Sequence, residues 1–332
     1  MLNSKRLWAA ILICALAAAL PGLAGAEEPI VFKMGFVDPE TAFFVIGGKK
    51  VAEEVEKATN GRIKIEVYAS AQLGSERDMV EGAQIGTIDI ATAANSVMSS
   101  FIPEMLVLDQ PFLFDSYEQA RHVIDGKLND LIVEKAKAKK LHVVGWIETG
   151  FRCTFSKRPI ASLADFKGLK IRTMENKMQI ATFNALGAIA TPMASNEQFT
   201  ALQQGTIDAN ENALANMKTN RYYEIIKNVA YTNHLYTFIG IIMSDKAYKR
   251  IPADLMPQFL EGIRNGTTWE HEFMIKSNRE SVEELSKNEG VVYREIDRDA
   301  LKAAIQPAME PFVKNMNPDW IKVIEEAKKE VK

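Results

Sequence analysis

One segment limits the possible folds of this chain more than any other, because residues 253–288 have the pattern of a single, unusually long helix. Apolar side chains such as Met256 and Ile263 recur along it at helical spacing, and Gly262 and Gly266 would permit a bend. A helix of about 36 residues would be about 54 Å long, which is more than one compact domain needs. We therefore expect this helix to cross two structural units.

The beginning of the chain has the pattern of a signal peptide, at residues 1–26. Lys5 and Arg6 precede an apolar run at residues 7–20, and a small-residue cleavage site follows at residues 24–26. The run is shorter than the stretch of about 20 apolar residues that a membrane-spanning helix needs. We therefore predict cleavage after residue 26 and export to the periplasm.

The charge balance and the cysteine content restrict the partners of the chain. It has 40 Lys and Arg residues against 43 Asp and Glu residues, and the predicted signal peptide removes two of the basic ones. Such a chain has no general attraction to nucleic acid or to an anionic membrane surface. Cys14 lies in the predicted signal peptide, so Cys153 has no partner for an internal disulfide. We expect a monomer that does not bind nucleic acid.

Helix and strand patterns alternate through the chain. Strand patterns occur first at residues 30–35, 62–68, 88–90 and 141–147, with helical patterns at residues 44–58, 75–85 and 117–138. The alternation then restarts, with strand patterns at residues 152–156 and 169–173 and helical patterns at residues 178–186 and 198–204. Alternation of this kind is typical of α/β units. The sequence therefore predicts an α/β fold with two mainly parallel sheets flanked by helices.

A short sequence occurs twice in nearly the same form. Residues 84–89 read Gln-Ile-Gly-Thr-Ile-Asp, and residues 203–208 read Gln-Gln-Gly-Thr-Ile-Asp. Either the helix-glycine-strand junctions are similar by chance, or the two segments are structurally equivalent parts of two lobes. In the second case, Asn95 and Asn212 follow the carboxyl ends of equivalent strands, where ligands bind in open α/β sheets.

Motifs typical of enzymes are absent from the sequence. It contains no phosphate-binding glycine loop, no dinucleotide-binding fingerprint and no Gly-x-Ser-x-Gly motif. The four histidines are scattered, and none is paired with another at metal-ligand spacing. We therefore predict no catalytic residue, no cofactor and no metal site.

Two arginines lie at the ends of predicted strands, outside the charged runs of the chain. A guanidinium group offers two parallel N–H donors that match the two oxygens of a carboxylate, so Arg152 and Arg172 are candidates for binding an organic acid. An alternative is open for Arg172. In the alternating pattern of residues 169–173 it shares a face with Lys170, as a residue in a surface salt bridge would.

The chain after the predicted signal peptide resembles the solute-binding subunit of tripartite ATP-independent periplasmic (TRAP) transporters, of the type that binds dicarboxylates and sialic acid. The segments that carry the resemblance are residues 72–77, 150–160, 167–172, 187–193, 201–205, 208–212 and 232–234. The resemblance implies two α/β lobes, joined by crossing strands and a long helix, that close on a small organic anion. It also implies delivery of that anion to membrane permease subunits driven by an ion gradient.

The resemblance assigns ligand-binding roles to three residues of the second lobe. In the family, the arginine of the Lys-Ile-Arg strand holds the ligand carboxylate, and here that residue is Arg172. The arginine after Gly-Phe, here Arg152, assists it. The asparagine of the Glu-Asn pair, here Asn212, bonds the same carboxylate.

The first lobe is expected to add further ligand contacts, from Asn95 and from the loop after Gly35. Ser75 and Glu76 open a helix that faces the cleft in the resemblance, so we name both as ligand-binding residues. Their alternative role is to cap that helix and to compensate its dipole. His234 either contacts the ligand or supports the hinge.

The resemblance divides the chain into two lobes, each made of two segments. Lobe I comprises residues 27–149 and 238–277, lobe II comprises residues 150–237 and 278–332, and the hinge strands lie near residues 147–152 and 234–240.

The ligand itself stays open among sugar acids, four-carbon dicarboxylates, 2-oxo acids and aromatic carboxylates. Ser195 stands where sialic-acid binders have an aromatic residue, which argues against sialic acid. Two other functions also stay open. The chain could present its ligand to a receptor kinase as a sensor module, or it could be a periplasmic enzyme that acts on carboxylates.

Overall fold

The computed structural model describes residues 28–331, and the predicted signal peptide at residues 1–26 lies outside them. The strands are β1 (Ile30–Gly35), β2 (Ile63–Tyr68), β3 (Ile90–Ala94), β4 (Leu141–Ser156), β5 (Lys170–Thr173), β6 (Ile189–Pro192), β7 (Ala209–Ala213), β8 (Asn228–Ser244) and β9 (Val292–Arg294). The α-helices are α2 (Phe43–Ala58), α3 (Glu76–Ile85), α4 (Asn95–Met98), α5 (Tyr117–Asp125), α6 (Lys127–Lys137), α7 (Lys177–Ala185), α8 (Gln198–Gln204), α9 (Asn216–Thr219), α10 (Asp245–Tyr248), α11 (Met256–Asn288), α12 (Arg298–Val313) and α13 (Pro318–Glu330).

The strands form one mixed sheet in the order β2-β1-β3-β8-β4-β7-β5-β6, and β9 pairs with β8. Strands β2, β1 and β3 make a parallel part, which we call the β1 side together with its helices. Strands β7, β5 and β6 make a second parallel part, which we call the β5 side together with its helices and loops. The α/β fold is therefore confirmed, although the hydrogen-bonded ladder is continuous where the sequence predicts two separate sheets.

The two parts are joined because β4 and β8 run through both of them. These strands, of 16 and 17 residues, pair antiparallel along most of their length, β8 also pairs with β3, and β4 also pairs with β7. The sequence predicts two strands in place of β4, but the structure has one strand with a register shift between Glu148 and Gly150. Gly150 has a φ of +85°, and a side chain there would meet Tyr117 at 2.9 Å, so glycine is needed at this bulge.

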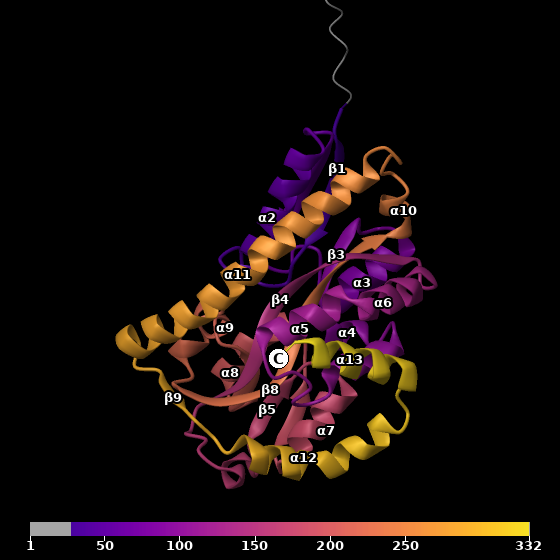
Figure 1. The fold of residues 1–332 in the computed structure, drawn as a ribbon. Helices are drawn as coiled ribbons and strands as arrows, with labels where there is room; N and C mark the ends of the chain where they lie inside the picture. The colour runs from indigo at the N-terminus through magenta and orange to yellow at the C-terminus, as the bar shows by residue number, and fades with distance from the viewer. Residues whose placement is uncertain (1–27, 332) are drawn as a thin grey trace, which may run out of the picture.

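The long helix α11 contains 33 residues, and it crosses from the β1 side to the β5 side (Figure 1). Its first half packs closely on α2, because a Cβ atom at Gly262 would lie 2.5 Å from Cα of Val55. Its second half reaches the β5 side, where the side chain of Asn278 accepts a hydrogen bond from the backbone of Ala215 at 2.8 Å. The predicted two-unit crossing is therefore confirmed.

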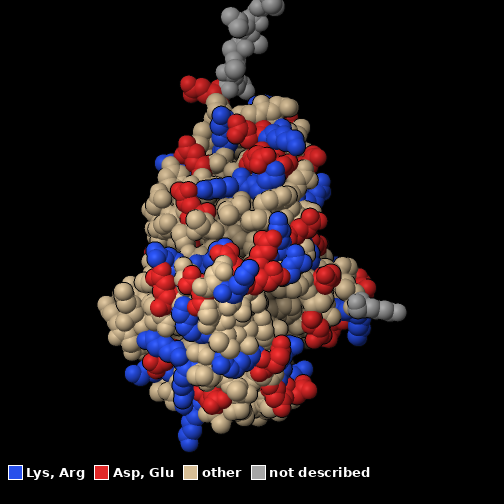
Figure 2. Space-filling model, turned by 90° about the vertical axis from the view of Figure 1, so that its left-hand side faces the viewer, with Lys and Arg blue, Asp and Glu red and all other residues tan. Residues whose placement is uncertain are grey.

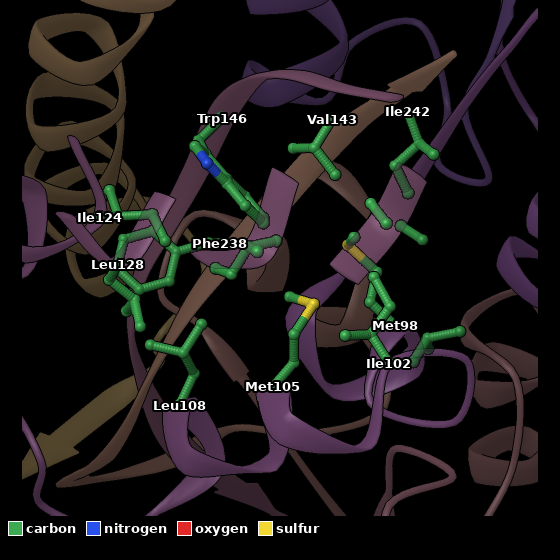
Figure 3. Close-up of a cluster of buried hydrophobic side chains, with 14 of the residues drawn as sticks. Met98, Ile102, Met105, Leu108, Ile124, Leu128, Val143, Trp146, Phe238 and Ile242 are labelled. Carbon is green, nitrogen blue, oxygen red and sulfur yellow. The ribbon is translucent and has the colours of Figure 1, made fainter. Parts of the chain in front are cut away.

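Separate hydrophobic clusters support the two sides. One cluster of the β1 side gathers methionine, leucine, isoleucine and aromatic side chains around Phe238 of β8 (Figure 3). The last helix, α13, adds Trp320 and Ile324 to this same cluster, although the predicted division places residues 278–332 in lobe II. Other clusters lie on the β5 side, around Phe183 and around Tyr222.

On the face in Figure 2, acidic and basic side chains are interspersed. Within residues 28–331, the helices are either too short or too polar to cross a lipid bilayer.

Candidate ligand-binding site

A polar cavity lies where the β1 side, the β5 side and the two crossing strands meet. The β1 side contributes Asp38, Phe44, Glu76 and Ala94, strands β4 and β8 contribute Thr149, Arg152, Thr237 and Ile239, and the β5 side contributes Arg172, Met174, Ser195, Asn212 and Asn216. A smaller space adjoins it and shares Glu76 and Arg172, and Ser75 and Arg77 also line this space. Four of the predicted ligand-binding residues, Arg172, Arg152, Asn212 and Glu76, therefore surround one cavity.

Arg172 lies near the end of β5 and is only 3% exposed, which does not fit a surface salt bridge. Its Nε and Nη2 atoms donate to the carbonyl oxygen of Met193, at 3.0 and 2.8 Å. Its Nη1 atom lies 3.8 Å from the carboxylate of Glu211, beyond hydrogen-bond distance. One edge of this buried guanidinium is therefore fixed by the backbone, and Nη1 has no hydrogen-bond partner among the described residues.

Arg152, by contrast, is already paired. Its Nη2 atom donates to Oε1 of Glu211 at 2.9 Å and to the Glu211 carbonyl oxygen at 2.6 Å, and its Nε atom donates to Oε2 of the same residue. Burial alone would raise the pKa of Glu211, but the charge of Arg152 and the nearby His234 outweigh burial and lower the pKa to about 2. Glu211 is therefore ionised and neutralises Arg152.

Sequence reasoning did not select Glu211, although this residue precedes Asn212 in the Glu-Asn pair. Its position next to Asn212 was the only feature of the sequence that could have pointed to Glu211. Its partner, Arg152, lies 59 positions earlier in the chain. His234 lies behind this ion pair. Its Nε2 atom is 3.5 Å from Oε2 of Glu211, and its Nδ1 atom is 2.9 Å from the hydroxyl of Thr232.

Asn212, in β7, lines the cavity. Its Oδ1 atom accepts hydrogen bonds from the backbone of Ala213 at 2.9 Å and from Nδ2 of Asn216 at 2.6 Å. Its own Nδ2 atom has no partner in the described part of the chain. Arg172 and Asn212 thus offer unused N–H groups from the β5 side, which is the arrangement that a carboxylate requires.

The opposite wall of the cavity carries two acidic residues, Asp38 and Glu76. Asp38 lies in the loop after β1. The sequence predicted a ligand contact from this loop but did not indicate which residue would make it. Its Oδ1 atom accepts a hydrogen bond from Asn220 of the β5 side at 2.9 Å. Burial raises the pKa of Asp38, and burial together with the charge of Asp38 raises the pKa of Glu76 to about 7.

Ser75 caps helix α3. Its hydroxyl accepts a hydrogen bond from the backbone of Asp78 at 3.2 Å, and the carboxylate of Asp78 accepts one from the backbone of Ser75 at 2.9 Å. This is the capping role that the sequence left open as an alternative. Ser75 lines only the smaller adjoining space.

Asn95 lies outside the cavity, in a second buried polar group that we call the Asp109 cluster and that comprises Asn95, Ser96, Asp109, Asn176 and Gln179. The carboxylate of Asp109 accepts from Nδ2 of Asn95 at 3.1 Å and from Nδ2 of Asn176 at 2.9 Å. Asn176 also caps helix α7 of the β5 side, so this cluster too connects the two sides. Burial raises the pKa of Asp109 to about 7 in spite of these hydrogen bonds.

Within residues 28–331, no group of three or more His, Cys, Asp or Glu side chains is placed to hold a metal ion. Cys153 is fully buried, and burial raises the pKa of its thiol to about 12. Because Arg172 and Asn212 line the cavity with unpaired N–H groups, the cavity is suited to binding an anion through hydrogen bonds and charge.

The chain matches known proteins over most of its length. Residues 35–318 match the bacterial extracellular solute-binding proteins of family 7 (DctP). A solute-binding protein from Verminephrobacter eiseniae is 34% identical over 277 residues, which cover 83% of each chain.

Two crystal structures are similar over nearly the whole chain. One is a TRAP periplasmic solute-binding protein from Polaromonas bound to D-erythronate, with 32% identity and a TM-score of 0.85, and the match covers 90% of this chain and 98% of that one. The other is the sugar acid binding protein DctPAm from Advenella mimigardefordensis in complex with galactonate, with 26% identity and a TM-score of 0.88, and the match covers 92% and 99% of the two chains.

The predicted periplasmic location and the prediction of a binding protein in place of an enzyme are confirmed by these relatives. The chain therefore belongs to the DctP-type extracytoplasmic solute-binding proteins of TRAP transporters.

Proposed function

We propose that this protein captures a small organic acid in the cavity between its two sides and delivers it to the membrane permease subunits of a TRAP transporter. The observation that carries the proposal is the guanidinium of Arg172, which is buried, held along one edge by a backbone carbonyl, and without a hydrogen-bond partner at Nη1 within the described residues. A ligand carboxylate would complete its hydrogen bonds, with the amide of Asn212 as a second donor. Sugar acids are the first class to test, because two similar proteins bind D-erythronate and galactonate.

Capture requires the two sides to separate and close again. The hydrogen bond between Asp38 and Asn220, at 2.9 Å, and the ion pair between Arg77 and Glu175, at 3.9 Å, cross between the sides beside the cavity. These contacts must break for the two sides to separate. A ligand that contacts both sides stabilises the closed state, and β4, β8 and α11 supply the connections about which the sides move.

The test is a thermal-shift screen of organic acids, followed by calorimetry on variants of Arg172. A ligand that binds the folded protein raises its melting temperature. Loss of one partner from a buried, hydrogen-bonded charge pair typically costs about 2–5 kcal/mol. We therefore expect Arg172→Ala to weaken binding by tens- to thousands-fold. We expect Arg172→Lys to bind poorly, because a lysine loses the planar guanidinium that Met193 holds along one edge and that directs Nη1 at a ligand.

Arg158→Ala is the matched control for this test. Arg158 also donates to backbone carbonyls, those of Asp165 and Lys167 at 2.8 and 3.1 Å, but it is exposed and lies outside the cavity. This control should bind the ligand as the unmodified protein does. Unchanged affinity in Arg172→Ala would contradict the proposal.

A further inference from the structure

The cavity has a cationic wall and an acidic wall. Arg172 and Arg152 lie on one wall, and Glu211 already neutralises Arg152. Asp38 and Glu76 are the charged residues that the β1 side contributes to the same cavity. One positive charge is therefore available to a ligand, and it lies on the wall formed by β5.

Both acidic side chains keep unused acceptor atoms. Asp38 accepts one hydrogen bond through Oδ1, from Asn220, and Glu76 accepts one through Oε1, from the backbone of Ala94 at 3.3 Å. Their other carboxylate oxygens have no hydrogen-bond partner within residues 28–331, and neither side chain forms an ion pair there. Both residues line the cavity, so their unpaired acceptors favour a ligand that brings O–H groups.

A second ligand carboxylate would meet the opposite situation. It would bring further acceptors and a negative charge to a wall whose charged residues in the cavity are two carboxyl groups. Burial and the charge of Asp38 raise the pKa of Glu76 to about 7, although the charges of Arg172 and Arg152 act to lower it. Placing like charges together at a buried interface is strongly unfavourable.

We propose that Asp38 and Glu76 set the ligand specificity: they accept hydrogen bonds from the hydroxyl groups of a polyhydroxy monocarboxylate and exclude a second carboxylate. The inference rests on the proposed function, because Arg172 must hold the single carboxylate for the hydroxyl-bearing end to reach Asp38 and Glu76. The inference restricts the expected ligands from organic acids in general to aldonic and uronic acids. Dicarboxylates with the same carbon skeleton are excluded from the expected ligands.

Two pairs of compounds isolate the far end of the ligand. D-Erythronate and meso-tartrate have the same four-carbon skeleton and differ in a terminal hydroxymethyl or carboxylate group, and galactonate and galactarate differ in the same way with six carbons. Calorimetry on the full-length mature protein at pH 8 should give at least one monocarboxylate that binds about 100-fold or more tightly than its dicarboxylate partner. A dicarboxylate that binds as tightly as its partner, or more tightly, would overturn the inference.

Glu76→Gln and Asp38→Asn then test the two side chains separately, since each keeps the shape and removes the negative charge. Each variant should reduce the preference for the monocarboxylate by about tenfold or more. Glu81→Gln, an exposed position on the same helix α3, is the control and should leave the preference unchanged. If both cavity variants keep the full preference, Asp38 and Glu76 do not set specificity.

Arg172→Ala separates failure of this inference from failure of the proposed function. Tight dicarboxylate binding that disappears in Arg172→Ala would overturn the inference and leave the proposed function intact. Binding that survives in Arg172→Ala, or no binding of any acid in a broad screen, would overturn both.

Discussion

Two buried polar regions connect the β1 side to the β5 side, and they differ in how completely the protein satisfies their charged groups. In the Asp109 cluster, the carboxylate of Asp109 accepts hydrogen bonds from both sides of the molecule, and Oε1 of Gln179 is the buried cluster atom without a partner within the described residues. In the cavity, Nη1 of Arg172 and Nδ2 of Asn212 lack partners within the described residues, and Asp38 and Glu76 keep free acceptors.

We interpret the Asp109 cluster as a structural connection between the two sides, and the cavity as the proposed binding site. The four residues with unpaired groups line the cavity, where a ligand can reach them. A ligand that supplies the missing partners would gain their hydrogen bonds on binding. The Asp109 cluster has less to gain from a ligand, because its central carboxylate already has its donors.

The largest effect is expected from breaking the ion pair between Arg152, which lines the cavity, and Glu211. Glu211→Gln leaves Arg152 buried without its counter-charge, and breaking a buried ion pair in this way typically costs about 3–5 kcal/mol of unfolding free energy. Urea denaturation at pH 7 measures this loss. The stabilisation is present above the ordinary pKa of a glutamate, near 4.5, and is lost as the pH falls toward 2, because the pKa of Glu211 is lowered.

Glu224→Gln is the control for Glu211→Gln. Glu224 pairs with Arg221 at the protein surface, where such a pair contributes about 1 kcal/mol or less. If the two substitutions destabilise the protein equally, the Arg152–Glu211 pair is not the buried charge pair described above.

A smaller effect, of a few kcal/mol at most, is expected from the pH dependence of the Asp109 cluster. The carboxyl group of Asp109 has an ordinary pKa of 3.8 in the unfolded chain and a pKa raised to about 7 in the folded protein. Because the unfolded state releases this proton first, stability should fall as the pH rises from about 4 to about 7. Asp109→Asn removes the titrating group, so its unfolding free energy should decline less over this range than that of the unmodified protein.

The contrast between the two regions also predicts that Asp109→Asn leaves the order of preference among organic acids unchanged. A pH dependence identical to that of the unmodified protein would show that Asp109 is already ionised near pH 4. An altered ligand preference would show that the Asp109 cluster is part of the binding site.

The smallest expected effect concerns Ser75. Ser75→Ala removes the cap of helix α3 and should cost about 1 kcal/mol of unfolding free energy, with ligand affinity nearly unchanged. Denaturation and calorimetry on the same variant distinguish the two roles that the sequence left open. Affinity that falls tenfold with no loss of stability would identify Ser75 as a ligand contact and not only a cap.

The parts of the fold that the sequence predicted are those with a local pattern. The 3.6-residue period marks α11, and the short alternating runs mark β1, β2 and β5, so these elements could be placed without the structure. The sequence could not predict that β4 is one continuous strand. The bulge at Gly150 interrupts the alternation, and the strand is held together by pairing with β8, which is distant in sequence.

The same distinction applies to the candidate site. Arg172 and Arg152 could be named as candidates because each was predicted at a strand end, and the family resemblance implied their roles, although Arg152 in fact lies inside β4. Glu211 could not be assigned its partner, because the pair depends on the register between β4 and β7, in which Thr154 lies opposite Glu211. Asn95 is bound within the Asp109 cluster, and its expected role in ligand binding stays a prediction.

The most direct test of the central claim is a crystal structure of the protein with a bound monocarboxylate from the specificity experiment. We expect the ligand carboxylate to lie within about 3 Å of Nη1 of Arg172 and Nδ2 of Asn212, with ligand hydroxyl groups directed at Asp38 and Glu76. A ligand bound elsewhere, for example in the outer groove lined by Arg121, Trp146 and Arg264, with Arg172 still held only by Met193, would contradict the account.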